Sequence, residues 1–131
     1  MYESLILVDP EAQLSMEALV GELRRFYSKA VEAAPDLQVS EDKLVLVWPE
    51  YHLMVHRSAA PHVLVESRWL SEEFAAGHAQ RDRIAACSVR FEISGPHDPD
   101  MDYFNDYLFV GEAAQRIAKV FRFEQASGEF V

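Results

Sequence analysis

The spacing of apolar residues changes from that of a strand to that of a helix within the first third of the chain. Tyr2–Val8 is a short apolar run followed by a turn sequence, which predicts a buried strand. Apolar residues then recur every three or four positions, and they predict a helix over residues 15–34 with Ser15 as its N-cap. The helix should end before Pro35, because a residue that precedes proline is disfavoured in the α region. Leu37–Val39 is then expected to form a brief edge strand.

The longest apolar and β-branched run of the chain is Lys43–Arg57, and we expect it to form the middle of a sheet. Pro49 stands near its centre and cannot donate a hydrogen bond to a neighbouring strand. A bent single strand and a hairpin both accommodate this proline. We favour the hairpin, with a reversal at Pro49 and Glu50 between strands Lys43–Trp48 and Tyr51–Arg57.

The second half of the chain alternates between strand and helix patterns. His62–Glu66 is predicted to be a strand that completes a three-stranded antiparallel meander. Ser71 is then expected to cap a helix of about fifteen residues. Ser88–Ser94 alternates between apolar and charged residues, which predicts a half-exposed strand. After a loop rich in Gly, Pro and Asp, either Asp100 or Asp102 should cap a last helix.

These elements predict the order β-α-β-β-β-α-β-α, and the alternating tail around Ser127 and Gly128 adds a short β element. Adjacent strands mixed with helices favour an α+β fold, with a single-layer, mostly antiparallel sheet and helices packed on one of its faces. The sequence contains no repeat, low-complexity tract or linker, so residues 1–131 are expected to form one domain.

The charge of the chain limits its partners. Twelve Lys and Arg residues against twenty-two Asp and Glu residues give a net charge of −10. Such a charge repels the phosphates of nucleic acids and anionic membrane surfaces, so we expect neither as a partner. It favours a basic protein partner, and it leaves association with a second copy of the chain open.

The cysteine content and the N-terminal residues bear on the compartment. Cys87 is the only cysteine, so no internal disulfide can form, which suits a reducing environment. The N-terminal residues include the acidic Glu3 and lack the basic start and long apolar core of a signal peptide. No apolar run approaches the roughly 18 residues that a membrane helix requires. We therefore expect a cytoplasmic protein.

The acidic loop before the last predicted helix has part of a calcium-binding pattern. Asp98, Asp100 and Asp102 have the spacing that opens an EF-hand loop. However, Tyr103 occupies the position of the required glycine, and Phe109 occupies that of the bidentate glutamate. We interpret the loop as a solvated segment whose acids cap a helix, and a weak contact with a divalent cation stays open.

No other motif for metal, cofactor or catalytic chemistry is present. His52 and His56 would lie about 13 Å apart in a strand that rises about 3.3 Å per residue, so they are not expected to share a metal. The sequence has no HExxH, CxxC, GxSxG, GxGxxG or P-loop pattern. Cys87 stands among apolar residues, which is typical of a small core residue. We expect no metal, no cofactor and no catalytic residue.

The candidate binding residues are aromatic, histidine and arginine side chains at the ends or on the surface of predicted strands. Trp48, Tyr51 and Trp69 are expected to be partly exposed, and Trp and Tyr are frequent in protein interfaces. His52 and Arg90 complete the set of candidate partner- or ligand-binding residues.

Arginine side chains on the predicted sheet surface have two interpretations. Arg57, Arg68 and Arg90 either pair with Glu66 and Glu92 across strands, which we favour, or form an anion site.

The sequence favours a non-enzymatic protein-binding domain such as an adaptor, a chaperone or an immunity-like protein. In size and acidity the chain resembles bacterial immunity proteins and secretion chaperones, although no motif carries that resemblance. The alternative is a small-molecule-binding protein or an enzyme, with a pocket between sheet and helices that is lined by Trp48, His52, Arg90 and Tyr107.

Overall fold

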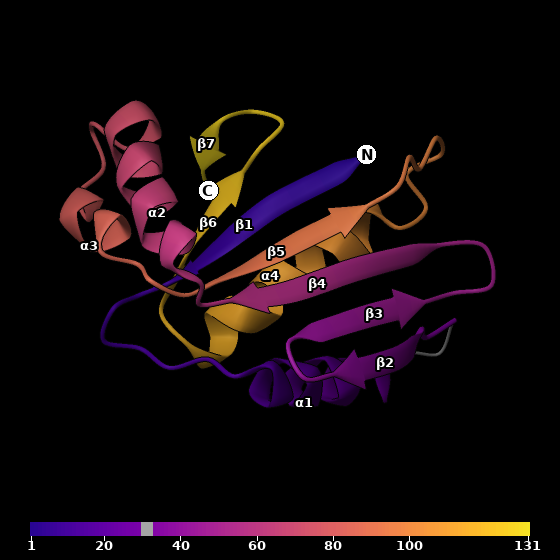
Figure 1. Cartoon of the computed structure of the whole chain (residues 1–131). Helices are drawn as coiled ribbons and strands as arrows, with labels where there is room; N and C mark the ends of the chain where they lie inside the picture. Colours follow the sequence, from indigo (N-terminus) through magenta and orange to yellow (C-terminus); the bar gives the residue numbers. More distant parts are fainter. Residues whose placement is uncertain (30–32) are drawn as a thin grey trace.

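The fold is a single antiparallel sheet with helices packed against it. The computed structural model describes residues 1–29 and 33–131, and within them it contains seven strands and four helices. The strands lie in the order β2-β3-β4-β5-β1-β6-β7, and every neighbouring pair is antiparallel (Figure 1). The predicted α+β fold is therefore confirmed. The strands are β1 (Tyr2–Val8), β2 (Asp36–Ser40), β3 (Lys43–Val47), β4 (His52–Ser58), β5 (Arg90–Gly95), β6 (Val120–Glu124) and β7 (Glu129–Phe130), and the helices are α1 (Met16–Tyr27), α2 (Pro61–Phe74), α3 (Arg81–Ala85) and α4 (Phe104–Ile117).

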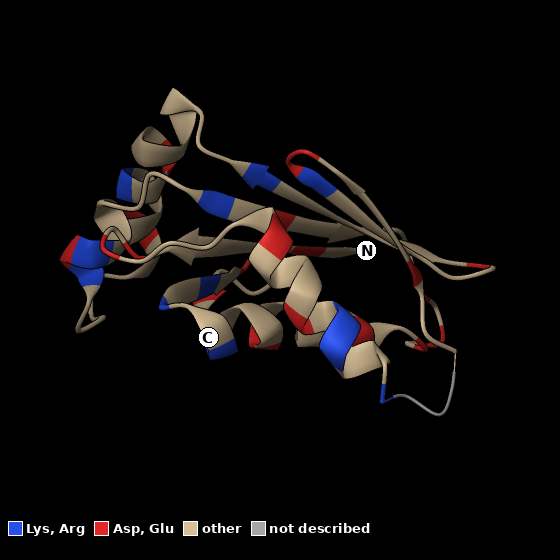
Figure 2. Cartoon of the chain, turned by 90° about the horizontal axis from the view of Figure 1, so that it is seen from below, with Lys and Arg blue, Asp and Glu red and all other residues tan. Residues whose placement is uncertain are grey.

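Alternating side chains of β1 divide the core between the two faces of the sheet. Ile6 and Val8 belong to the larger apolar cluster, which also contains the buried faces of α1 and α4. Leu5 and Leu7 belong to a second cluster with side chains of α2, α3 and β6. Helices thus cover both faces, α1 and α4 on one and α2 and α3 on the other, whereas the sequence placed all of them on one face. Figure 2 shows the sheet edge-on with helices to either side.

The helices α2 and α3 cover only part of their face. They pack over β1 and β6, and the second cluster contains no side chain of β2, β3 or β4 among the described residues. His52 and His56, which point to this face from β4, are exposed, and Val45 and Val47 of β3 are half-buried. One half of this face is therefore open.

The predicted hairpin at Pro49 is confirmed. Strands β3 and β4 pair from Lys43↔His56 to Val47↔His52, and the Trp48 N–H donates to the Tyr51 carbonyl at 2.8 Å across the turn. The edge strand near 37–39 is confirmed as β2, and the short β element of the tail is confirmed as the pairing of β6 with β7.

The helix predicted over 15–34 is shorter than expected. Its N-cap is correct, because the Ser15 hydroxyl accepts from the Ala18 N–H at 3.0 Å. The last helical residue is Tyr27, and Ala33 and Ala34 are not helical. Residues 30–32 of the prediction lie outside the described residues.

The strand predicted at His62–Glu66 is wrong, because this segment forms the first turns of α2. Pro61 occupies the first helical turn, where its missing N–H costs no hydrogen bond. Val63, Ser67 and Leu70 are buried at helical spacing, so the period of the pattern is that of a helix. Ser71 is accordingly no N-cap but a buried residue of α2, and its hydroxyl donates to the Arg81 carbonyl at 2.9 Å. The meander consists of β2, β3 and β4 instead.

Candidate functional site

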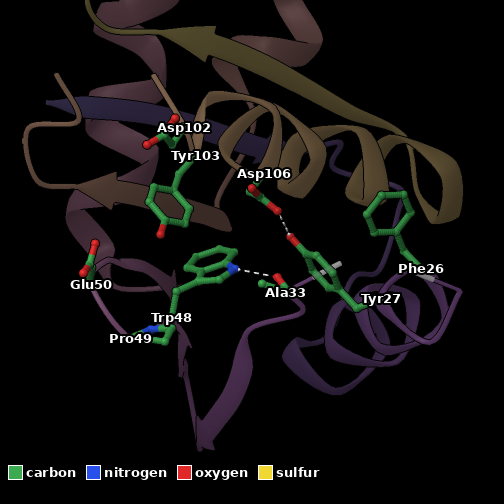
Figure 3. Close-up of a pocket in the computed structure, with 9 residues that line it drawn as sticks. All are labelled: Phe26, Tyr27, Ala33, Trp48, Pro49, Glu50, Asp102, Tyr103 and Asp106. Carbon is green, nitrogen blue, oxygen red and sulfur yellow. Dashed lines mark hydrogen bonds between the residues drawn. The ribbon is translucent and has the colours of Figure 1, made fainter. Parts of the chain in front are cut away.

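A cleft of about 560 Å³ opens where the end of α1, the start of α4 and the β3–β4 turn meet. Aromatic and acidic side chains make up most of its lining (Figure 3). The lining residues are Phe26, Tyr27, Ala33, Trp48, Pro49, Glu50, Asp102, Tyr103 and Asp106. We call this feature the acidic aromatic cleft.

Trp48 forms the inner wall of the cleft. Its side chain is only 5% exposed, and its indole N–H donates to the Ala33 carbonyl at 3.1 Å (Figure 3). The Tyr103 ring lies beside it, with centroids 4.9 Å apart. The expectation that Trp48 and Tyr51 are partly exposed is therefore wrong. Both rings are part of the core, because the turn folds back against α4 and presents them inward.

Tyr51 supports this wall from behind. Its ring stacks on Tyr103 with centroids 4.5 Å apart and planes 7° from parallel. Its hydroxyl donates to the Pro96 carbonyl at 2.7 Å, and burial raises its pKa to about 12. Gly95 permits this contact, because a Cβ there would lie 2.5 Å from the Tyr51 hydroxyl oxygen. A larger residue at Gly95 would displace the wall.

Asp98 fixes the loop that leads into α4. Its carboxylate accepts hydrogen bonds from the Tyr103 N–H at 2.9 Å, the Asp102 N–H at 3.2 Å and the Tyr2 hydroxyl at 2.8 Å. Burial alone would raise the pKa of Asp98, but these hydrogen bonds lower it. The predicted cap at Asp100 or Asp102 is wrong, since α4 has no side-chain N-cap and Asp98 satisfies the N–H groups just before it.

Three carboxyl groups surround the cleft. Glu50 and Asp102 are exposed at its mouth, whereas Asp106 is half-buried and accepts a hydrogen bond from the Tyr27 hydroxyl at 2.6 Å. Burial raises the pKa of Asp106, and the hydrogen bond from Tyr27 offsets this only in part. No Lys or Arg occurs among the described residues that line the cleft. The described lining residues therefore supply no cation to these three carboxyl groups.

Such a lining can stabilise a positively charged group. The faces of Trp and Tyr rings attract cations, at about 0.5–2 kcal/mol per contact depending on desolvation. Carboxylates add charge attraction and accept hydrogen bonds from ammonium or guanidinium groups. Within the described parts of the chain, no group of three or more His, Cys, Asp or Glu side chains is arranged to hold a metal ion.

The other candidate residues lie away from the cleft. His52 points to the open half of the opposite sheet face and is exposed. Trp69 is 53% exposed on α2, where it contacts Phe74 edge-on with centroids 5.5 Å apart. Tyr107 is buried and stacks on Tyr2. The structure thus brings Trp48 and Tyr51 together but does not bring Trp48, His52, Arg90 and Tyr107 into one pocket.

Arg90 is buried within a network of carboxylates on the α2 face. Its guanidinium donates to Glu92 at 2.8 Å and to Glu66 at 3.3 Å. The favoured interpretation, cross-strand pairing of Arg57, Arg68 and Arg90 with Glu66 and Glu92, is correct only in that Arg90 forms ion pairs with both acids. Neither pair is cross-strand, because Glu92 lies on β5 with Arg90 and Glu66 lies on α2. Arg57 takes no part, because its side chain points to the other face and donates to the Leu14 carbonyl.

The sequence did not identify Tyr27, Tyr103 and Asp106 as site residues. Tyr103 and Asp106 belong to the acidic segment that the sequence singled out, but there they have the appearance of a solvated loop and helix start. Tyr27 lies 79 positions before its hydrogen-bond partner Asp106, and no local pattern indicates that pairing.

Comparisons with known proteins identified no relative of this chain. No protein-family model, no curated protein and no solved structure matches this chain. None of the helices in residues 1–29 and 33–131 has the length and apolar character needed to cross a membrane.

Proposed function

We propose that the protein is a non-enzymatic, cytoplasmic protein-binding module whose acidic aromatic cleft accepts a basic segment of a partner protein. The observation that carries this proposal is the combination of Glu50, Asp102 and Asp106 with aromatic walls and without a lining Lys or Arg. A guanidinium group beside the half-buried Tyr27 or Tyr103 would meet both an aromatic side chain and a carboxylate.

The electrostatics of the whole chain support the same class of partner. A net charge of −10 attracts a basic partner over distance and speeds its encounter. Because Glu50 and Asp102 are exposed, their contribution falls as salt screens it, with a Debye length of about 10 Å at about 0.1 M. The proposed complex should therefore weaken markedly at high ionic strength.

A small cationic molecule is the second candidate ligand. The cleft is concave and of a size typical of small-molecule sites, which start at about 300 Å³. Like the pocket predicted from the sequence, the cleft lies where the sheet meets the helices. Of the four residues predicted to line that pocket, only Trp48 lines the cleft. It differs from the protein partner in that a single arginine or lysine derivative should then bind as tightly as a peptide.

Calorimetric titration with the peptide acetyl-Gly-Arg-Gly-Arg-Gly-amide tests the proposal. The variant Glu50→Gln/Asp102→Asn should bind it about tenfold more weakly, because two mouth carboxylates lose their charge. Glu72→Gln/Glu73→Gln, two exposed acids of α2, changes the net charge equally and should leave the affinity near that of the wild type. If both variants weakened binding equally, the loss would come from the change in net charge alone. That result would contradict the proposal that the peptide binds in the cleft.

A further inference from the structure

The two edges of the sheet differ in their capacity to pair with another chain. Strand β7 has two residues, which is too short to offer a useful edge. Strand β2 has five residues, pairs with β3 in regular register from Asp36↔Val47 to Ser40↔Lys43, and contains no proline. It therefore lacks the bulge or proline that usually protects an edge strand.

The hydrogen-bond alternation of β3 shows which groups of β2 are free. Arg57 N–H donates to the Asp42 carbonyl and Trp48 N–H donates to the Tyr51 carbonyl, so even-numbered residues of this segment bond toward β4. The odd-numbered residues of β3 then bond toward β2, where their partners are Asp36, Gln38 and Ser40.

The N–H and C=O groups of Leu37 and Val39 consequently point away from β3. Among the described residues, neither takes part in a backbone hydrogen bond outside the sheet ladders. Since β2 is the outermost strand, these four groups form a free hydrogen-bonding row along the edge.

A groove of about 550 Å³ lies between α1 and the Val39 end of this row, and Val39, Ser40 and Glu41 line its strand side. Met16 and Val20 of α1 are buried at its floor, and the Val39 side chain, 46% exposed, forms part of its β2 wall. A Cβ placed on Gly21 would meet no other atom within 4 Å, so the middle of the groove is open. The groove thus offers apolar contacts next to the free backbone groups of Val39.

The ends of the groove carry opposite charges. Glu17 and Arg24 both line it and lie seven residues apart on α1, or about 10 Å along the helix axis. α1 begins beside the β2–β3 turn in Figure 1, so Glu17 lies at the same end as Glu41 of that turn. The Glu17 end is therefore acidic, and the Arg24 end is basic.

We infer that β2 is a strand-addition site, at which an extended segment of a partner protein pairs with Leu37 and Val39. Main-chain hydrogen bonds give such a complex its affinity, and side-chain pockets give it specificity. The segment should place an apolar side chain over Val20, Gly21 and Val39 and a basic side chain near Glu17 and Glu41. This site is separate from the acidic aromatic cleft, and neither proposal depends on the other.

Selection from a displayed library of linear nonapeptides tests the inference. Selected peptides should alternate apolar and polar residues and include a Lys or Arg. Val39→Pro removes the outward N–H without breaking a bond to β3, and it should weaken these peptides about tenfold or more. Val39→Thr keeps the N–H and should bind within about threefold of the wild type. Gly21→Leu, which fills the groove at a position with free space, should weaken binding independently of any strain in β2.

Amide hydrogen exchange locates the peptide. Addition of a selected peptide should slow exchange of the Leu37 and Val39 amides, and Glu50→Gln/Asp102→Asn should not alter its affinity. A failure to select peptides, or equal binding by Val39→Pro, would overturn the inference. Protection of the same two amides by raising the protein concentration without peptide would overturn it as well, since the occupant would then be a second copy of the chain.

Discussion

Asp9 and Asp106 show two ways in which this fold encloses a carboxyl group. Asp9 follows β1, is 2% exposed, and accepts a hydrogen bond from the Arg83 Nε at 2.6 Å. The bonds from Arg83 lower the pKa of Asp9 and outweigh the opposing effect of burial. Asp106 is half-buried with the neutral Tyr27 hydroxyl as its partner, and burial raises its pKa.

The two carboxyl groups differ in whether the chain itself supplies a cation. Asp9 has one and serves the structure, whereas Asp106 has none and is suited to binding a cation. At Asp9 the chain supplies the cation, and the ion pair ties α3 to the end of β1. Arg90 supplies it in the same way to Glu66 and Glu92. At the acidic aromatic cleft the chain supplies none from the described lining residues. A cation from outside would therefore relieve an electrostatic cost at the cleft, whereas it has no such role at Asp9.

The largest expected effect concerns the wall of the cleft. Trp48→Ala should lower the free energy of unfolding by about 3–5 kcal/mol, because it removes a buried indole. Trp69→Ala on the exposed surface of α2 should cost less than about 1 kcal/mol. Urea unfolding of the two variants measures this contrast. Similar losses in both would mean that Trp48 is not part of the core and that the cleft has no fixed inner wall.

A smaller effect follows from the lowered pKa of Asp9. A carboxyl group whose pKa is lowered on folding adds stability above its ordinary value of 3.8, and that stability is lost as the pH falls through the folded-state pKa. The wild type should therefore lose stability as the pH falls from about 5 through the acidic range, and Asp9→Asn should be less stable at neutral pH with a flatter profile. Urea midpoints across this range give the comparison. Parallel profiles for the two proteins would contradict the structural role of the Asp9–Arg83 pair.

Asp106 should behave in the opposite sense and more weakly. Its raised pKa means that the folded state favours the protonated form, so its contribution to stability is largest below its ordinary value of 3.8 and is lost as the pH rises through the folded-state pKa. Asp106→Asn keeps an acceptor for the Tyr27 hydroxyl and removes the charge. It should be as stable as the wild type, or up to about 1 kcal/mol more stable, at pH 7. A clear loss of stability at pH 7 would contradict this expectation. It would show that contacts in the folded protein stabilise the charged Asp106 carboxylate by more than its burial costs.

The contrast between these regions also explains what the sequence could predict. Pro49 within an apolar run was enough to locate the β3–β4 hairpin, because the missing N–H of proline is a local constraint. The apolar residues of His62–Glu66 have strand character locally, and only the helical spacing of Val63, Ser67 and Leu70 with Pro61 before it indicates α2. The local sequence therefore predicted the β3–β4 hairpin correctly but predicted a strand where α2 forms.

The cleft could not be derived from the sequence for a different reason. The acidic segment and Trp48 were both identified, but as a solvated loop and an exposed turn. Their meeting depends on long-range contacts, namely Tyr51 on Tyr103 and Tyr27 on Asp106. The burial of Trp48 follows from the same contacts and cannot be read from its neighbours in the chain.

Fluorescence of Trp48 tests the central claim most directly. Trp69→Phe leaves Trp48 as the only tryptophan, and its indole lines the acidic aromatic cleft. Titration with acetyl-Gly-Arg-Gly-Arg-Gly-amide should change the Trp48 emission in a saturable way, and the matched peptide with Glu in place of Arg should not. Glu50→Gln/Asp102→Asn in the same background should shift the curve to about tenfold higher peptide concentration. An emission that stays constant, while calorimetry detects binding of the arginine peptide, would place that peptide elsewhere and contradict the account.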